Sequence, residues 1–232
     1  SGKKDKDKYN RTTTAIFAKT LINKIYKYAK EEKGYKGENM IDPIRDNSIF
    51  KKSEVKHHKG IREEDLGRYW NSLKQLKNYQ DTVILFIYSI TALRVNSLTN
   101  SRWSWFDASK RVLNIPAEFM KRKQAFITPL PQFLVEHLVQ LKAMRRAGKD
   151  DYIFINSKGD KYDNNRPLHL VKNVLGFDYA TAHGARNVLK VHCERSGKFN
   201  SLAIKAQMHH ENTNKVEAAY MQDYDWLKER FE

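Results

Sequence analysis

The chain contains little cysteine, proline or glycine for its length. Its 232 residues include one cysteine, five prolines and ten glycines. A single cysteine, Cys193, excludes an intrachain disulfide and fits a reducing compartment, so we expect a cytoplasmic location. Cys193 lies in an apolar helical pattern, which predicts a buried thiol. No cysteine and histidine residues have zinc-site spacing, and no glycine-rich phosphate loop is present. The expected chemistry therefore needs no metal ion and no cofactor.

Long apolar runs and acidic residues are also scarce. No run reaches the roughly 18 apolar residues of a membrane-spanning helix, and no secretory signal pattern opens the chain. Lysine and arginine number 43 against 27 aspartates and glutamates, which gives a net charge of +16. This surplus indicates a polyanionic partner, because basic side chains placed on phosphates release condensed counterions. The basic residues do not form one amphipathic stripe, so nucleic acid is favoured over an anionic membrane.

Hydrophobic periodicity predicts an α+β fold that is mostly helical. A long helix is expected from Thr12 to Lys33, followed by a loop and by a basic linker over residues 51–60. Short apolar pieces between residues 103 and 131 alternate with polar turns, as in a small antiparallel sheet. Further helices are expected from about residue 62 and over residues 82–93, 132–147, 168–175, 183–196, 201–209, 215–222 and 226–231. The organisation is therefore a small helical segment with a linker, residues 1–55, before a helix-rich domain with a small sheet, residues 56–232.

Several basic and hydroxyl side chains lie next to apolar stretches. Arg94 directly follows the apolar run 82–93, where a charge must be paired or must reach solvent. His183 and Arg186 are three residues apart, so one face of a helix presents both. Tyr220 ends the segment Val216-Glu-Ala-Ala-Tyr220. Taken singly, each of these residues fits an ordinary structural role such as a helix cap, a buried hydrogen-bond donor or a core aromatic.

Taken together, the order and spacing of these residues resemble the tyrosine recombinase (phage integrase) family. The segments that carry the resemblance are Thr91-Ala-Leu-Arg94-Val-Asn-Ser-Leu, Ser101-Arg-Trp-Ser-Trp-Phe-Asp107, Met120-Lys121-Arg-Lys-Gln-Ala-Phe-Ile-Thr-Pro-Leu130, Ala182-His183-Gly-Ala-Arg186 and Met208-His-His210-Glu-Asn-Thr-Asn-Lys-Val-Glu-Ala-Ala-Tyr220. The match extends over about residues 60–232 and is nearest to integrases of prophages and genomic islands. It implies that residues 56–232 are the catalytic domain and that residues 1–55 are part of a helical core-binding domain. An arm-site-binding domain has no counterpart, which suggests a fragment.

The resemblance also implies a reaction and its residues. A DNA strand would be cleaved and rejoined through a 3′-phosphotyrosine, without metal or ATP, by Arg94, Lys121, His183, Arg186, His210 and Tyr220. The two arginines would hold the phosphate oxygens, because an always-charged guanidinium binds oxyanions bidentately. The histidine three residues before the second arginine would accept the proton of the tyrosine, whose ordinary pKa is about 10. The lysine would protonate the departing 5′ oxygen, and the second histidine would hydrogen-bond the phosphate.

Some assignments have neighbouring rivals: Tyr224 for Tyr220, Lys123 for Lys121, and His209 for His210. The spacing between the histidine and the tyrosine favours His210 and Tyr220 over their rivals. The residues directly around each candidate favour Tyr220 and Lys121. The sequence departs from the family where an acidic residue usually follows the first arginine by three positions, because Ser97 stands there. Ala185 replaces the usual leucine. Both departures make reduced activity conceivable.

The partners implied by the family are double-stranded DNA, three further copies in a homotetramer on two duplexes, and accessory DNA-bending factors. The expected location is the bacterial cytoplasm at the nucleoid, with no membrane partner. Residues 223–232 either dock on a neighbouring copy or pack on their own domain, and the sequence leaves both open. Two other functions compete with recombination: a DNA-binding module that no longer cleaves, and a DNA-relaxing enzyme similar to type IB topoisomerases.

Overall fold

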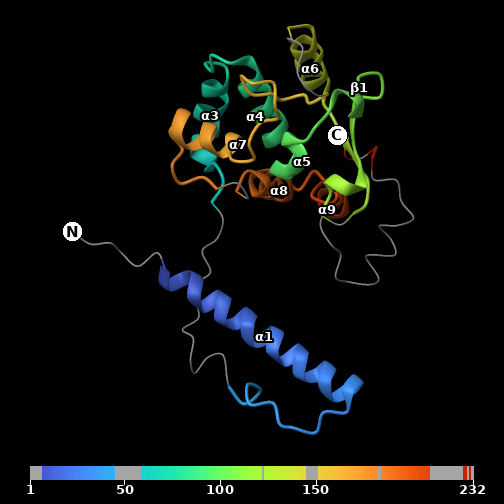
Figure 1. Ribbon diagram of the computed structural model, residues 1–232. Coiled ribbons are helices and arrows are strands. Elements are labelled where there is room, and N and C mark those ends of the chain that lie inside the picture. Colours follow the sequence, from blue (N-terminus) through green and yellow to red (C-terminus); the bar gives the residue numbers. More distant parts are fainter. Residues whose placement is uncertain are drawn as a thin grey trace, which may run out of the picture. The chain divides into compact units, whose positions relative to one another are not determined.

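The computed structural model of the chain describes residues 7–44, 59–121, 123–144, 151–181, 184–209, 227, 228 and 230. It divides into two compact units, Ser1–His57 and His58–Glu232 (Figure 1). In the part of the chain that is described, no helix is long and apolar enough to cross a membrane.

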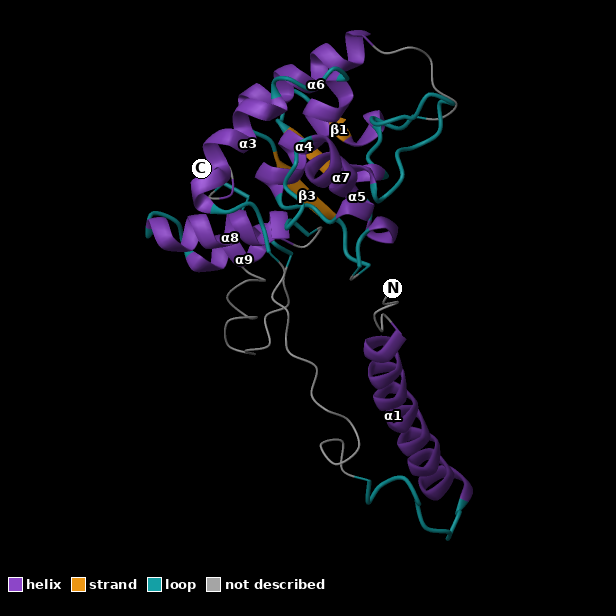
Figure 2. Cartoon of the chain, turned by 90° about the vertical axis from the view of Figure 1, so that its left-hand side faces the viewer, coloured by secondary structure: helices purple, strands orange, loops and turns teal. Residues whose placement is uncertain are grey.

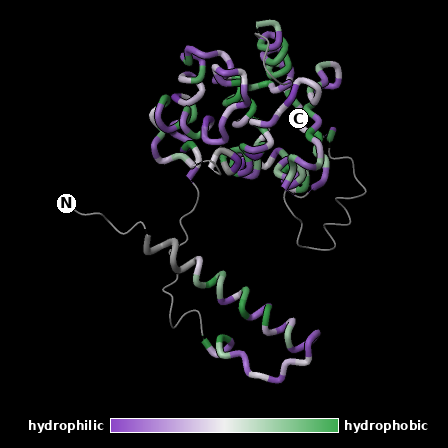
Figure 3. The backbone as a smooth tube through the Cα atoms, viewed as in Figure 1, coloured by the Kyte–Doolittle hydropathy of each residue, from purple (hydrophilic) through white to green (hydrophobic). Residues whose placement is uncertain are grey.

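The first unit contains one long helix and a loop packed along it. Helix α1 spans Asp7–Lys33 and therefore begins five residues before the predicted start at Thr12. It ends at Gly34, which has a φ of +63°, a conformation that glycine adopts without a steric penalty. The loop covers one side of the helix, where the rings of Tyr26 and Tyr35 lie 5.9 Å apart. Hydrophobic residues recur along α1 (Figure 3), and some of them, such as Phe17 with 69% exposure, remain outside this contact.

The second unit is built around the buried helix α4, Tyr79–Thr91. Residues 81–88 are all buried, which confirms the prediction of a buried helix from the apolar run. Five helices contact α4 directly: α3 (Leu66–Leu73), α5 (Val95–Thr99), α6 (Gln132–Met144), α7 (Arg166–His169) and α8 (Gly184–Ser196). The described residues of this unit also form α9 (Ser201–Gln207), the π-helix η4 (Leu170–Val174) and the 3-10 turns η1 (Glu63–Asp65), η2 (Trp103–Trp105) and η3 (Ala117–Phe119).

A small antiparallel sheet lies beside these helices (Figure 2). Its strands are β1 (Phe106–Asp107), β2 (Val112–Ile115) and β3 (Phe126–Pro129), in the order β1-β2-β3. The ladder between β2 and β3 ends at the pair Ile115 and Phe126, after which residues 116–125 connect the two strands. The predicted α+β architecture, mostly helical with a small antiparallel sheet, is therefore confirmed.

Several sequence predictions differ from the structure in detail or lie outside what it describes. The helix expected over residues 168–175 starts earlier and continues as a π-helix. Cys193 is half-buried, so its thiol is less enclosed than predicted. The helix expected over residues 215–222 lies outside the described residues, as does the predicted end of α6 near Gly148.

Candidate active site

The corner between α4 and α5 holds the first arginine. Helix α4 ends at Ala92, which has a left-handed φ of 52° and is 1% exposed. The Thr91 hydroxyl donates to the carbonyl oxygen of Ile87 at 2.7 Å, which satisfies an acceptor in the last turn. Arg94 then takes the extended conformation of an N-cap residue, with φ −67° and ψ 141°, and α5 begins at Val95. The half-buried Arg94 therefore lies at the junction of α4 and α5.

The second arginine lies on the first turn of α8 and is almost fully buried. Arg186 is 6% exposed, and its Nη2 donates to the carbonyl oxygen of Met208, just beyond α9. Burial, and to a smaller extent the positive charge of Arg94, lower the pKa of Arg186 to about 10, while the Tyr88 phenol acts in the opposite direction. The two guanidinium groups are therefore close enough to repel each other. Because a bound oxyanion would relieve this repulsion, the pair is suited to hold a phosphate.

The connection between β2 and β3 carries Lys121. Met120, which is 4% exposed, anchors the connection in the core, and Lys121 follows it at an exposed position. The Lys123 ammonium donates to the carbonyl oxygen of Glu118 at 3.3 Å. Among the described residues the Lys121 ammonium has no hydrogen-bond or ion-pair partner. Of the two candidate lysines, Lys121 is thus the one whose ammonium is available for a substrate.

Ser97 joins this connection to α5. Its side chain is buried, and its hydroxyl donates to the carbonyl oxygen of Phe119 at 3.1 Å. This hydrogen bond thus links α5, the helix that follows Arg94, to the turn that precedes Lys121. Ser97 therefore has a structural contact of its own at the position where the family usually has an acidic residue.

The end of α9 closes the same region. Gln207 donates from Nε2 to the carbonyl oxygen of Thr91 at 2.7 Å, which ties α9 to the end of α4. His209 has a positive φ of 47°, and its ring centroid lies 4.9 Å from that of Phe126 on β3. These contacts bring the end of α9 next to both the arginine corner and the sheet.

A residue near the C-terminus also packs on this region of its own unit. Arg230 Nε donates to Gln207 Oε1 at 2.8 Å, and Nη2 donates to the carbonyl oxygen of Ile127 at 2.6 Å. Its guanidinium carbon lies 4.6 Å from the centroid of the Phe126 ring. Arg230 therefore packs on its own unit, whereas most of the predicted docking segment 223–232 lies outside the described residues.

Of the six predicted catalytic residues, the structure describes three, and it brings Arg94 and Arg186 together. Arg94 and Arg186 interact electrostatically, and Lys121 lies on the connection that Ser97 joins to the arginine corner. The remaining three predicted residues, His183, His210 and Tyr220, lie outside the described residues, as does the rival Tyr224.

Sequence reasoning missed the supporting residues Gln207, Tyr88 and Phe126. Gln207 carried a weak signal, because it is a polar residue directly before the Met-His-His segment. Tyr88 and Phe126 have the pattern of ordinary core aromatics, so only their positions in space reveal their contacts. Within the described residues, no group of three or more histidine, cysteine or acidic side chains could hold a metal ion.

Comparison with known sequences identifies the family of this chain. The chain belongs to the phage integrase family, whose sequence model matches residues 59–225. The prophage integrase IntZ of Escherichia coli K12 is 24% identical over 171 residues, which cover 73% of this chain and 42% of that protein. The integrase of Enterobacteria phage P4 is 28% identical over 157 residues, which cover 61% of this chain and 35% of that protein. The matches span about two-fifths of the length of these curated relatives.

Solved structures show the same fold. The integrase of transposon Tn1549, solved in complex with circular intermediate DNA, superposes with a TM-score of 0.67 and 13% identity, covering 92% of this chain and 79% of that chain. The XerA recombinase superposes with a TM-score of 0.56 and 14% identity, covering 99% of this chain and 93% of that chain.

Proposed function

We propose that this chain carries the DNA-cleaving and DNA-rejoining activity of a site-specific recombinase. The observation that carries the proposal is the pair Arg94 and Arg186, one of them buried, whose positive charges act on each other. Membership of the phage integrase family supports the same activity. Related folds have been solved with DNA, namely the Tn1549 integrase with circular intermediate DNA and the XerH recombinase with its difH substrate.

The arginines act on the charge that develops during strand cleavage. Negative charge grows on the non-bridging phosphate oxygens as a fifth oxygen approaches phosphorus. Guanidinium groups that are already fixed in place stabilise this charge without reorganisation at the moment of reaction. Arg186 is fixed by its bond to the Met208 carbonyl oxygen, and Arg94 by its place between two core helices.

Tyr220 is the proposed nucleophile, His183 the base that accepts its proton, and His210 the donor that binds the phosphate. The phenolate attacks phosphorus and displaces the 5′ oxygen, which leaves a 3′-phosphotyrosine. Attack of a 5′ hydroxyl on this ester reverses the step, so rejoining needs no nucleotide cofactor. The positive charge of the two arginines favours the phenolate over the neutral phenol.

Lys121 is the proposed general acid. Lys121 is exposed on the connection between β2 and β3, and among the described residues its ammonium has no partner that would compete with a departing 5′ oxygen. Lys123 is less suited to this role, because its ammonium already donates to the Glu118 carbonyl oxygen. Protonation of the alkoxide removes the charge that would otherwise favour the reverse reaction.

For the whole protein we propose the arrangement usual in the family. Residues 1–55 are part of a core-binding domain, residues 56–232 form the catalytic domain, and the chain acts on double-stranded DNA as a homotetramer with accessory DNA-bending factors. The net charge of +16 supports binding to DNA. The proposed location is the bacterial cytoplasm at the nucleoid.

A DNA-binding module that no longer cleaves is the second candidate, because Ser97 replaces the usual acidic residue. The contact between Ser97 and the Phe119 carbonyl oxygen keeps α5 joined to the Lys121 connection, so we favour the active enzyme.

The test is incubation of the protein with a nicked DNA that carries a candidate core site, in which the cleaved end diffuses away and traps the intermediate. A covalent protein–DNA band on a denaturing gel is the expected result. Binding to core sites without such a band would instead favour the binding module. Relaxation of supercoiled DNA that lacks a specific site would favour the topoisomerase-like enzyme.

A further inference from the structure

Lys59–Ile61, near the start of the second unit, contacts residues that precede α8 in the sequence. We call Lys59–Ile61 the lead-in segment. The Lys59 carbonyl oxygen accepts hydrogen bonds from the Thr181 backbone nitrogen at 2.9 Å and from the Thr181 hydroxyl at 3.2 Å. The Gly184 nitrogen in turn donates to the Thr181 carbonyl oxygen at 2.9 Å and lies 3.1 Å from the Thr181 hydroxyl oxygen. Thr181 thus links the lead-in segment to the first residue of α8.

Two glycines allow the backbones to meet. A Cβ atom on Gly184 would lie 2.6 Å from the Gly60 nitrogen and would collide with the Lys59 carbonyl group. A Cβ atom on Gly60 would collide with the Gly184 carbonyl oxygen and with the Val188 side chain. Neither glycine has a positive φ, so the reason for glycine at both positions is close packing and not backbone conformation.

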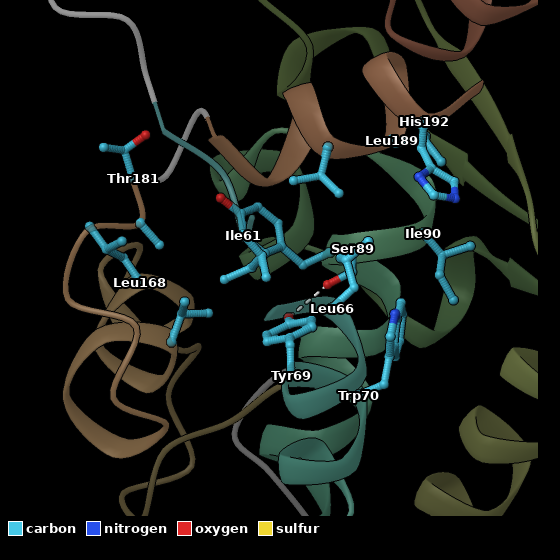
Figure 4. Close-up of a pocket in the computed structure, with 14 residues that line it drawn as sticks. Ile61, Leu66, Tyr69, Trp70, Ser89, Ile90, Leu168, Thr181, Leu189 and His192 are labelled. Carbon is cyan, nitrogen blue, oxygen red and sulfur yellow. Dashed lines mark hydrogen bonds between the residues drawn. The ribbon is translucent and has the colours of Figure 1, made fainter. Parts of the chain in front are cut away.

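Side chains extend this contact. Ile61 lines a cavity of about 170 Å³ together with Leu189 of α8 and Leu66 of α3 (Figure 4). The next residue, Arg62, places its guanidinium carbon 4.5 Å from the centroid of the Tyr179 ring, and the Tyr179 hydroxyl donates to Asp65. The chain from Lys59 to Asp65 therefore contacts Thr181, Gly184 and Tyr179 in turn.

We propose that the lead-in segment positions the active-site end of α8, with Gly60, Thr181 and Gly184 as positioning residues. This inference rests on the proposed recombinase function. Gly184 lies two residues before Arg186 and directly after His183 in the sequence. A shift of the first turn of α8 would move the Arg186 guanidinium relative to Arg94 and to the Met208 carbonyl oxygen.

The test compares Gly184→Ala with Gly67→Ala in the full chain. Gly67 lies on α3, and a Cβ atom there would meet nothing within 4 Å, so Gly67→Ala is the matched control. In single-turnover cleavage of a nicked DNA, Gly184→Ala should lower the rate constant on the order of 10²-fold, as expected for misplacement by about 1 Å. Affinity for the DNA should stay within about threefold of the wild type. The control should cleave at the wild-type rate.

Substitutions of Thr181 provide a second set of variants, which adds no non-hydrogen atom to the contact. Thr181→Val keeps the shape but removes the hydroxyl, and Thr181→Ser restores the hydroxyl. We expect a slower cleavage rate constant for Thr181→Val and near wild-type cleavage for Thr181→Ser. If the role were purely structural, Gly184→Ala and Thr181→Val would have a lower melting temperature and a smaller active fraction, but the active molecules would cleave with the wild-type rate constant. This result would overturn the proposal.

Amide hydrogen exchange separates this inference from the proposed function. The Thr181 amide should be protected in the wild type and should exchange at least tenfold faster in Gly60→Ala. If the wild type forms no covalent adduct, the proposed function fails, yet loss of protection in Gly60→Ala would still support the linkage to α8. An unprotected Thr181 amide in the wild type would refute the linkage whether or not the protein cleaves DNA.

Discussion

Replacing Arg186 by methionine should stabilise the free protein while it abolishes most of the cleavage activity. The pKa of Arg186 is lowered from its ordinary value to about 10, mainly by burial and in addition by the charge of Arg94. Arginine is charged below its pKa, so a lowered pKa in the folded state means that folding disfavours the charged form. This cost is fully present at neutral pH and disappears only as the pH rises from about 10 towards the ordinary pKa of arginine.

The magnitude follows from the size of the pKa change. One pKa unit corresponds to about 1.4 kcal/mol, so the charged Arg186 costs roughly 3 kcal/mol of folding free energy. Its hydrogen bond to the Met208 carbonyl oxygen stabilises the folded state by about 2 kcal/mol, a typical value for a charged donor. Arg186→Met removes both contributions and fills the site with an apolar side chain. We therefore expect a gain of about 1 kcal/mol, or a rise of roughly 2–4 °C in the melting temperature for a chain of this size.

The assay is thermal unfolding at neutral pH and low salt, combined with single-turnover cleavage. Cleavage by Arg186→Met should fall on the order of 10²–10³-fold, as for the loss of one donor to a developing oxyanion. Millimolar sulfate should raise the melting temperature of the wild type more than that of the variant, because the anion offsets the repulsion between the two arginines. A fall of several degrees in the melting temperature of Arg186→Met would refute the reasoning, since Arg186 would then be a net stabilising residue without an anion.

Three further predictions concern the lysine, the charge and Ser97. Lys121→Ala should slow cleavage on the order of 10²–10⁴-fold. A substrate with sulfur at the 5′ bridging position should restore its rate, because a thiolate leaves without protonation, whereas Lys123→Ala should stay within a few-fold of the wild type on both substrates. A larger defect in Lys123→Ala would exchange the two roles. Affinity for DNA should fall steeply with salt, with a slope of log K against log salt of about −0.9 per phosphate contact, and titrations at several salt concentrations that gave a flat slope would contradict the proposed basic DNA interface. Ser97→Ala should lose the bond to the Phe119 carbonyl oxygen at a cost of about 1 kcal/mol, seen as a fall of roughly 2–4 °C in the melting temperature, and an unchanged melting temperature would show that this bond does not hold the connection.

The elements that the sequence predicted correctly are those with strong local patterns. The apolar run after Asp81 is too long for a typical strand, and the structure confirms a buried helix there. Short apolar pieces around Val112 and Phe126, separated by polar turns, likewise predicted the sheet. Asp81 itself was expected only to precede the apolar run, but it is buried inside α4 and paired with Arg166, 85 residues further along the chain. A partner at that separation leaves no trace in a local pattern.

The same limit applies to the candidate site. The motifs marked Arg94 and Arg186, but their mutual repulsion depends on how α4, α5 and α8 pack together. The contact between Lys59 and Thr181 joins residues 122 positions apart, and the need for glycine at position 184 follows from that contact alone. Motif spacing can name the residues of a site, whereas burial, electrostatic interactions and backbone contacts require the fold.

The most direct test of the central claim is to locate the covalent bond in the trapped protein–DNA adduct. The adduct formed on a nicked core-site DNA is digested with protease and nuclease, and the modified peptide is sequenced by mass spectrometry. The proposed function predicts a nucleotide esterified to the hydroxyl of Tyr220, no adduct in Tyr220→Phe, and an adduct in Tyr224→Phe. A nucleotide on Tyr224 or on any other side chain, or an adduct that persists in Tyr220→Phe, would contradict it.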